Sequence, residues 1–269
     1  IFVIPGVPKE NEYFWPIIKK HLPPNDTQFY RSEMVKICGV GESQFETDLQ
    51  SIIASLPHSL QPAYLPYYGE VWFYLYSYQK NREVIQTAEL IIQKIKEKWR
   101  PYLFSRWGNT LEEACGKLLQ KLNFTLATAE SCSGGLFSHR LTNISGSSAY
   151  FCRGYVVYSN QAKVEDLDIP SSTLSQYGAV SEEIARALAE RVRLKSETDI
   201  GIGITGIAGP TGGSEQKPVG LVYTALSDLH HTNVKKNLFS GDRDAIKILS
   251  TQAAFTLLFQ YLQERMNDE

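Results

Sequence analysis

From Thr110 to the C-terminus, apolar stretches with strand character alternate with amphipathic stretches of helical periodicity. A chain that alternates in this way buries its strands between layers of helices, so we expect an α/β layered sheet in this half. The pattern T-x-x-E at Thr110 is typical of a capping box and predicts a helix that ends near Leu122. Strands are expected at 124–129, 154–158, 199–205, 219–226 and 234–239, and further helices at 134–141, 181–194 and 243–263.

The first half has a different pattern, which predicts a small α+β module. We expect a strand at 34–40, a helix at 42–54, an aromatic strand region at 64–78 and a closing helix at 82–99. Proline and glycine punctuate the chain between these two halves, where the composition also shifts. The expected domains are the module at 29–106 and the α/β domain at 107–269.

The chain opens on an apolar run, Ile1–Ile4, which leads directly into Pro5 and Gly6. Such a run is typical of a strand, and the following segment offers it no partner. We therefore expect residues 1–28 to be the tail of a further domain that lies upstream.

Charge and hydropathy bear on the class of partner. Residues 1–109 carry 12 basic and 11 acidic side chains, and residues 110–269 carry 15 and 18. Neither half has the basic excess that is typical of proteins that bind nucleic acid or membrane surfaces. No apolar run reaches the roughly 18 residues of a membrane span. We expect a cytoplasmic protein that binds neither membranes nor nucleic acid.

Cysteine and histidine usage argues against a metal site and against a Ser-His-Asp triad. The four cysteines show no C-x-x-C spacing and lie in apolar patterns, so we expect them to be reduced and buried. Cys132 and His139 are seven positions apart, about 10 Å along a helix, which is too far for a nucleophile and its base. The remaining histidines, which are His21, His58, His230 and His231, lie in the first half or in a probable hairpin turn.

Serines, one tyrosine and one lysine are concentrated between Glu130 and Lys163. A serine becomes a nucleophile when a base takes its proton, and a lysine with a lowered pKa can be that base. Ser131 follows a strand, where it could also simply cap a helix. Ser148 precedes the next strand, which spans roughly 16 Å, so it meets Lys163 only if the chain folds back. The residues therefore leave Ser131 and Ser148 in competition.

Two further patterns could hold an anion. The glycine-rich run 205–214 lets backbone N–H groups approach a phosphate or an oxyanion closely. The match to G-x-G-x-x-G at 201–206 is weak, because its glycines lie within a strand pattern and Pro210 follows, and we reject a dinucleotide site. Arg243 could clamp a phosphate, although capping of the last helix by Asp242 is the safer interpretation.

The aromatic strand region places Trp72, Tyr74, Tyr76 and Tyr78 on one face. Aromatic stripes can stack on single-stranded nucleic acid, but a buried interface fits the weak charge of this module better.

Taken together, the motifs of the second half resemble the CinA, or competence-damage-inducible, family. Two departures are small: Ser133 stands where the family usually has threonine, and Gln216 where it has glutamate. The matching segments are 127–135 (ATAESCSGG), 146–151 (GSSAYF), 157–163 (VYSNQAK), 177–181 (YGAVS), 204–210 (ITGIAGP) and 217–220 (KPVG).

This resemblance implies an amidohydrolase that converts nicotinamide mononucleotide to nicotinate mononucleotide and ammonia, without a metal or other cofactor, and a homodimer. By the same resemblance Ser148 would be the nucleophile, Lys163 its base and Tyr158 an assisting group. The substrate would be bound by Ser131, Gly134, Gly135, Thr205, Gly206, Gly209 and Arg243. A desolvated Lys163 could stay neutral and take the serine proton.

The resemblance extends to the first half. Residues 4–10 are similar to the closing strand of a molybdopterin-binding-like domain, and residues 30–105 to a KH-like linker module. Full-length members pair that first domain with metal-dependent ADP-ribose pyrophosphatase activity, which we do not expect of this chain. The alternative function is a non-catalytic nucleotide-binding or interaction module linked to DNA uptake.

Overall fold

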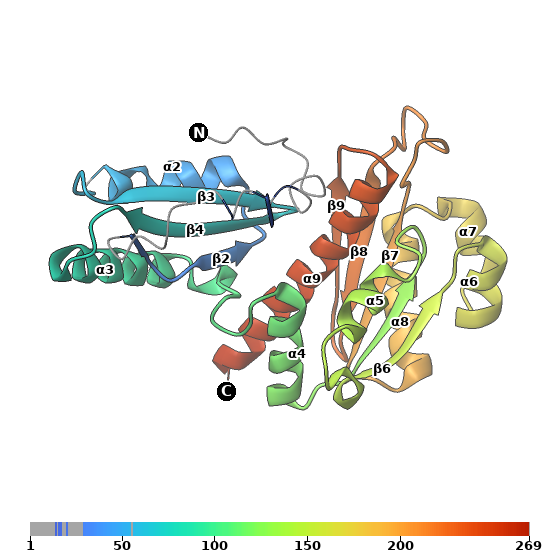
Figure 1. The fold of residues 1–269 in the computed structure, drawn as a ribbon. Helices are drawn as coiled ribbons and strands as arrows, with labels where there is room; N and C mark the ends of the chain where they lie inside the picture. The colour runs from blue at the N-terminus through green and yellow to red at the C-terminus, as the bar shows by residue number, and fades with distance from the viewer. Residues whose placement is uncertain (1–13, 15, 18–19, 21–28, 55, 269) are drawn as a thin grey trace.

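The computed structural model describes residues 14, 16–17, 20, 29–54 and 56–268, and the expected tail at 1–28 lies almost entirely outside them. The described chain forms two sheets with separate cores, and helix α9 runs between them (Figure 1). The N-terminal part contains β1 (Tyr30–Arg31), β2 (Val35–Cys38), α2 (Glu42–Ile53), β3 (Gln61–Tyr67), β4 (Glu70–Ser77), α3 (Arg82–Lys98) and the 3-10 helix η1 (Arg100–Tyr102).

The N-terminal sheet is antiparallel and is built around β4. Strand β3 pairs with one edge of β4, and β1 and β2 pair with the other. The β3–β4 hairpin turns through Tyr68 and Gly69, both of which have positive φ, as the tight turns of hairpins require. Helices α2 and α3 cover one face of the sheet, where β4 buries Val71, Phe73 and Leu75. The opposite face carries the aromatic stripe, and its Tyr78 is exposed.

The C-terminal part contains the strands and helices of the expected α/β layered sheet, and this fold class is confirmed. Its sheet has the order β6-β5-β7-β8-β9, in which β6, β5 and β7 pair in parallel, β8 pairs antiparallel with β7, and β9 pairs antiparallel with β8. The strands are β5 (Leu126–Glu130), β6 (Phe151–Val156), β7 (Ile200–Gly206), β8 (Leu221–Ser227) and β9 (Thr232–Leu238). The helices are α4 (Leu111–Leu122), α5 (Leu136–Thr142), η2 (Ser147–Ala149), α6 (Asn160–Leu167), α7 (Ser171–Tyr177), α8 (Glu182–Ser196) and α9 (Arg243–Asp268).

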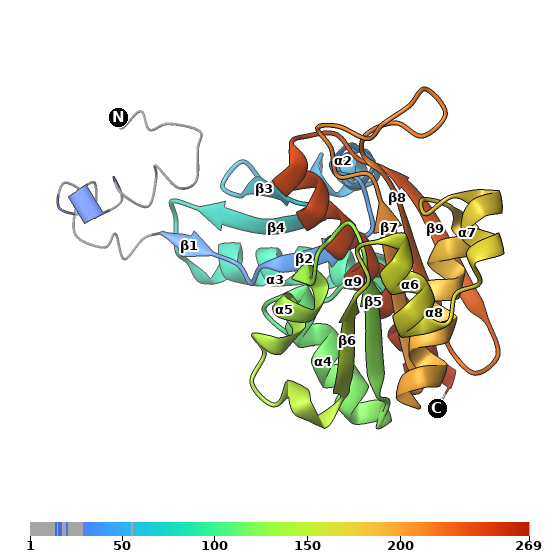
Figure 2. The same ribbon diagram turned by 90° about the vertical axis from the view of Figure 1, so that its right-hand side faces the viewer.

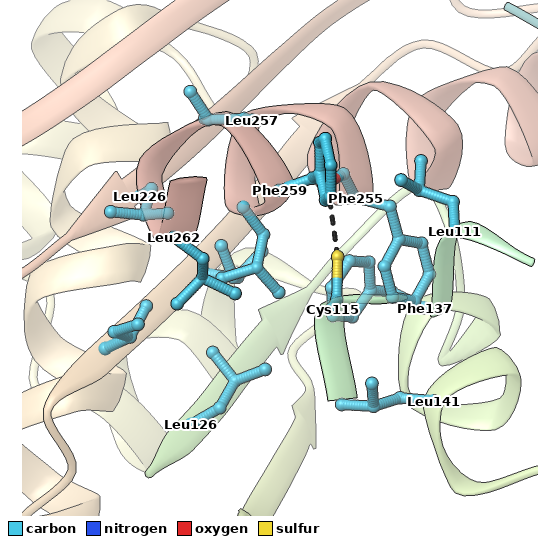
Figure 3. Packing of buried hydrophobic residues seen from close by; sticks show 14 of the residues in the cluster. Leu111, Cys115, Leu126, Phe137, Leu141, Leu226, Phe255, Leu257, Phe259 and Leu262 are labelled. Atoms are coloured by element: carbon cyan, nitrogen blue, oxygen red, sulfur yellow. Dashed lines mark hydrogen bonds between the residues drawn. The ribbon is translucent and has the colours of Figure 1, made fainter. Parts of the chain in front are cut away.

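Helices cover both faces of this sheet. Helices α4, α5 and α9 share one core with the sheet, in which Phe137 stacks on Phe255 and the Cys115 thiol donates to the Phe255 carbonyl (Figure 3). Helix α8 packs against the other face, with α6 and α7 beside it (Figure 2). Among the described residues, no helix is both long and apolar enough to cross a membrane.

The glycines of β7 explain the pattern that resembled a dinucleotide motif. A Cβ atom at Gly201 would lie 2.1 Å from the Ala189 carbonyl oxygen, and one at Gly203 would lie 2.5 Å from that of Ala185. Both carbonyls belong to α8, so these glycines allow helix and strand to pack at close range. The rejection of a dinucleotide site is consistent with this role.

A buried polar network joins the two parts of the chain. Arg140 of α5 donates to Glu112, to the Thr251 hydroxyl and to the side-chain oxygen of Gln252. The Gln252 amide in turn donates to Glu70 of the N-terminal sheet at 2.8 Å. Burial raises the pKa of the Glu70 carboxyl, although hydrogen bonds from Trp72 and Gln252 act against that shift.

Candidate functional site

Ser131 lies at the carboxyl edge of the sheet, immediately after β5. Its backbone N–H donates to the Ile204 carbonyl at 2.9 Å, which fixes the residue against the neighbouring strand β7. The chain then turns through Gly134 and Gly135, both with positive φ, before α5 begins. The Gly134 N–H closes this turn on the Ser131 carbonyl at 3.1 Å. We call residues 131–135 the serine turn.

Lys163 reaches the serine turn from α6, the helix that follows the carboxyl end of the adjacent parallel strand β6. It lies on α6, whose N-terminus is capped by the Ser159 hydroxyl, and its side chain is 1% exposed. The Lys163 Nζ atom lies 3.0 Å from Ser131 Oγ, 2.8 Å from the Val157 carbonyl oxygen and 3.4 Å from that of Tyr158. As an ammonium, Lys163 donates to all three oxygens; after it loses a proton, the neutral amine can still donate to both carbonyls and accept the serine proton on its lone pair.

Desolvation shifts Lys163 toward its neutral form. Burial lowers the pKa of Lys163 to about 8, and the nearby Cys132 acts weakly in the opposite direction. In the described part of the chain no carboxylate forms an ion pair with it. A lysine whose pKa lies near the working pH can act as a general base.

Glu130, for which no role was predicted from the sequence, accepts hydrogen bonds that fix the serine turn in place. Its side chain is fully buried and accepts four hydrogen bonds. The donors are the Ser133 hydroxyl, the Phe137 N–H, and both the N–H and the hydroxyl of Ser138, at 2.7–3.0 Å. All of them belong to the serine turn or to α5, so this carboxylate fixes the segment that follows Ser131.

We expect Glu130→Gln to lower the free energy of unfolding by about 2–4 kcal/mol, because its amide N–H groups would face donors and leave some of them unsatisfied. Urea unfolding followed by circular dichroism measures the change. Glu165→Gln is the matched control, because Glu165 accepts one hydrogen bond from Gln161 on the exposed face of α6. Equal stability of the Glu130→Gln and Glu165→Gln proteins would contradict this role for Glu130.

Tyr158 and Arg243 contact each other next to Lys163, whose Nζ atom lies near the Tyr158 carbonyl. The Arg243 guanidinium donates to the Tyr158 hydroxyl at 2.9 Å and to the Gly209 carbonyl at 2.5 Å. The Tyr158 side chain is 59% exposed, whereas its backbone carbonyl faces Lys163. Arg243 therefore ties the glycine-rich loop to the segment between β6 and α6.

Thr205 and Gly206, which were expected to bind the substrate, lie at the end of β7 and make contacts within the fold. The Thr205 hydroxyl is buried and donates to the Ala179 carbonyl at 2.7 Å, which fixes the loop before α8. A Cβ atom at Gly206 would lie 2.6 Å from the Val222 side chain, so glycine is needed there for packing.

Within one chain, the structure does not bring Ser148 and Lys163 together. Ser148 is exposed on η2, which precedes β6, and Lys163 follows the opposite end of that strand. A strand of this length separates its two ends by roughly 20 Å. The chain does not fold back around β6, and it is Ser131 that lies against the lysine.

The cysteines and histidines contribute no nucleophile or base here. Cys132 is buried, and desolvation raises its pKa to about 12, as expected for a packed thiol. Cys152 is exposed, which corrects the expectation that all four cysteines are buried. Within the described residues, Ser131 has no hydrogen bond to a histidine, and no His, Cys, Asp and Glu side chains form a metal-ligand set.

The fold and this geometry define the protein as an α/β-domain protein with a buried serine–lysine pair at the carboxyl edge of its sheet. The family model described as the CinA C-terminal domain matches residues 108–262. The chain belongs to the CinA family.

Individual relatives agree with this assignment. A protein from Moorella thermoacetica that is named a competence-damage inducible protein is 42% identical to this chain, over 97% of this chain and 64% of its own length. The chain thus spans less than two thirds of that relative. The crystal structure of the competence/damage inducible protein CihA from Agrobacterium tumefaciens has 35% identity and a TM-score of 0.55, covering 57% of this chain and 93% of its own. A CinA superfamily structure from Escherichia coli is similar at 31% identity and a TM-score of 0.54, covering 56% and 90%.

Proposed function

We propose that this chain hydrolyses the carboxamide of nicotinamide mononucleotide to nicotinate mononucleotide and ammonia, with Ser131 as nucleophile and Lys163 as general base. The observation that carries the proposal is the buried contact of 3.0 Å between Lys163 Nζ and Ser131 Oγ. The family resemblance supports the substrate class, and the contact between Ser131 and Lys163 supports Ser131 rather than Ser148 as the nucleophile.

The reaction proceeds in two halves. In the first, Lys163 takes the Ser131 proton while Oγ bonds to the carboxamide carbon, and the resulting ammonium then gives its proton to the departing nitrogen. The C–N bond breaks, ammonia leaves and an acyl ester on Ser131 remains. In the second half, Lys163 takes a proton from water as the hydroxide adds to the ester, the ester C–O bond breaks and the proton returns to Ser131.

The tetrahedral intermediates carry a negative oxygen that needs hydrogen-bond donors. The Ser131 and Gly134 N–H groups donate within the fold, so the donors would be other backbone N–H groups of the serine turn, whose glycines allow the substrate to approach closely. Glu130 fixes this turn before substrate arrives, so the donors need little rearrangement during the reaction.

The test is ammonia release from nicotinamide mononucleotide by the purified chain between pH 6 and pH 10. Because the base must be neutral, kcat/KM should rise with pH and level off above an apparent pKa of about 8. A rate that falls between pH 7 and pH 9 would contradict Lys163 as the base. Tight binding of the nucleotide with no ammonia at any pH would favour the alternative, a non-catalytic nucleotide-binding module.

A further inference from the structure

Lys247 of α9 lies over the serine turn, and the mechanism above does not use it. Its Nζ atom is 3.9 Å, and its Cε atom 4.0 Å, from the position that a Cβ atom would take at Gly134. The side chain is half-buried, and within the described residues it has no hydrogen bond or ion pair. A lysine that loses part of its hydration without gaining an anionic partner is electrostatically unsatisfied.

Arg243 adds a second positive charge on the same face. It precedes Lys247 by four residues, which is one helical turn, so the two side chains are neighbours on α9. The two groups that accept from Arg243 are neutral, namely the Gly209 carbonyl and the Tyr158 hydroxyl. The nearby Asp242 accepts from the Ala245 N–H as a helix cap and forms no ion pair with Arg243. The region beside Ser131 therefore holds two cations that have no carboxylate partner among the residues that the structure describes.

We propose that Lys247 binds the phosphate monoester of the substrate, beside Arg243, and so selects nucleotides over nucleosides. This inference rests on the proposed function. Nicotinamide mononucleotide carries its carboxamide and its phosphate at opposite ends, and an anion is the group that these cations lack. The lysine acts as a point charge on the phosphate, while the hydrogen bonds of Arg243 hold its guanidinium in place.

A contact to the phosphate is made in the ground state and in the transition state alike, because the phosphate takes no part in the reaction. Its loss should therefore raise KM more than it lowers kcat. A contact between separated, partly exposed charges is also weakened by salt, so the preference for the nucleotide should fall as ionic strength rises.

The experiment compares kcat/KM for nicotinamide mononucleotide and for nicotinamide riboside, which lacks the phosphate, in Lys247→Met protein. We expect the nucleotide-to-nucleoside ratio of kcat/KM to fall about 10- to 100-fold, through KM, and to recover largely in Lys247→Arg. Lys235→Met is the control for the loss of one positive charge, because Lys235 is exposed on β9 at the far edge of the sheet.

An unchanged ratio in Lys247→Met, or equal losses on both substrates, would overturn the inference and leave the proposed function standing. If the wild-type chain releases no ammonia, the proposed function fails, and calorimetric binding of nicotinate mononucleotide decides the role of Lys247. Weaker binding of this nucleotide to Lys247→Met, with binding of nicotinate riboside unaltered, would then support the phosphate contact. Equal binding of the nucleotide by both proteins would refute it.

Discussion

Replacement of Ser131 by alanine should lower ammonia release from nicotinamide mononucleotide by roughly a thousandfold or more, because in the described part of the chain no other hydroxyl forms a hydrogen bond with Lys163 and could replace the proposed nucleophile. The substitution removes a single oxygen atom from a nearly buried side chain, so the fold should be retained. Steady-state ammonia release and circular dichroism of the same preparation measure the two quantities.

Ser148→Ala is the matched comparison, since the family resemblance pointed to Ser148 and the structure points to Ser131. We expect this protein to keep activity within about threefold of the wild type, because the Ser148 hydroxyl lies at the opposite end of β6. An inactive Ser148→Ala protein together with an active Ser131→Ala protein would reverse the assignment. Trapping of an acyl-enzyme followed by peptide mapping would identify the modified serine directly.

Replacement of Lys163 by methionine should abolish turnover to a similar extent, since the site contains no second base within hydrogen-bond distance of Ser131 in the described structure. Methionine is close in length and apolar, so it fills the buried space that the lysine stem occupies. The Ser131 hydroxyl would remain, but the base proposed to take its proton would be absent. Activity within tenfold of the wild type would exclude Lys163 as the base.

The same variant has a defined effect on the pH dependence of stability. The pKa of Lys163 is lowered to about 8 in the folded chain and is about 10.4 in an unfolded chain. Between these values the unfolded chain binds more protons, so Lys163 makes stability rise with pH from about 8 to about 10. Below pH 8 its destabilising effect is fully present. The Lys163→Met protein should lack this rise, and melting curves of both proteins from pH 7 to pH 10 measure the difference. Parallel curves would show that the lysine is not desolvated.

Regular elements with a strong local signal could be predicted from the sequence. The expected cap at Thr110 is present, because its hydroxyl accepts from the Glu113 N–H at the start of α4. The expected helix at 82–99 appears as α3, whose apolar positions are buried at helical spacing. Helices α6 and α7 were missed, since each is short and buries few apolar side chains. The local sequence pattern around Lys163 was therefore too weak to predict that this residue lies on a helix.

The site could be predicted in composition but not in pairing. Which serine meets Lys163 depends on the parallel pairing of β5 with β6, which brings the carboxyl ends of both strands to one edge. Nothing in the spacing of Ser131, Ser148 and Lys163 along the chain encodes that pairing. Glu130 had a signal that could have been used, since a carboxylate at the end of an otherwise uncharged strand, just before two serines, must find donors when it is buried.

The polar network between the two sheets bears on how chains of this family can gain or lose parts. The face of α9 that meets the N-terminal module includes Gln252, Thr256 and Gln260, and Gln252 joins it to Glu70. Side chains of this kind can hydrate when a neighbour is removed, unlike a continuous apolar surface. The crystal structures of relatives that match little more than half of this chain over nearly all of their own length are consistent with such separability. Because part of this junction consists of amides and hydroxyls beside its apolar contacts, removal of the module would expose less apolar surface than removal from a wholly apolar junction.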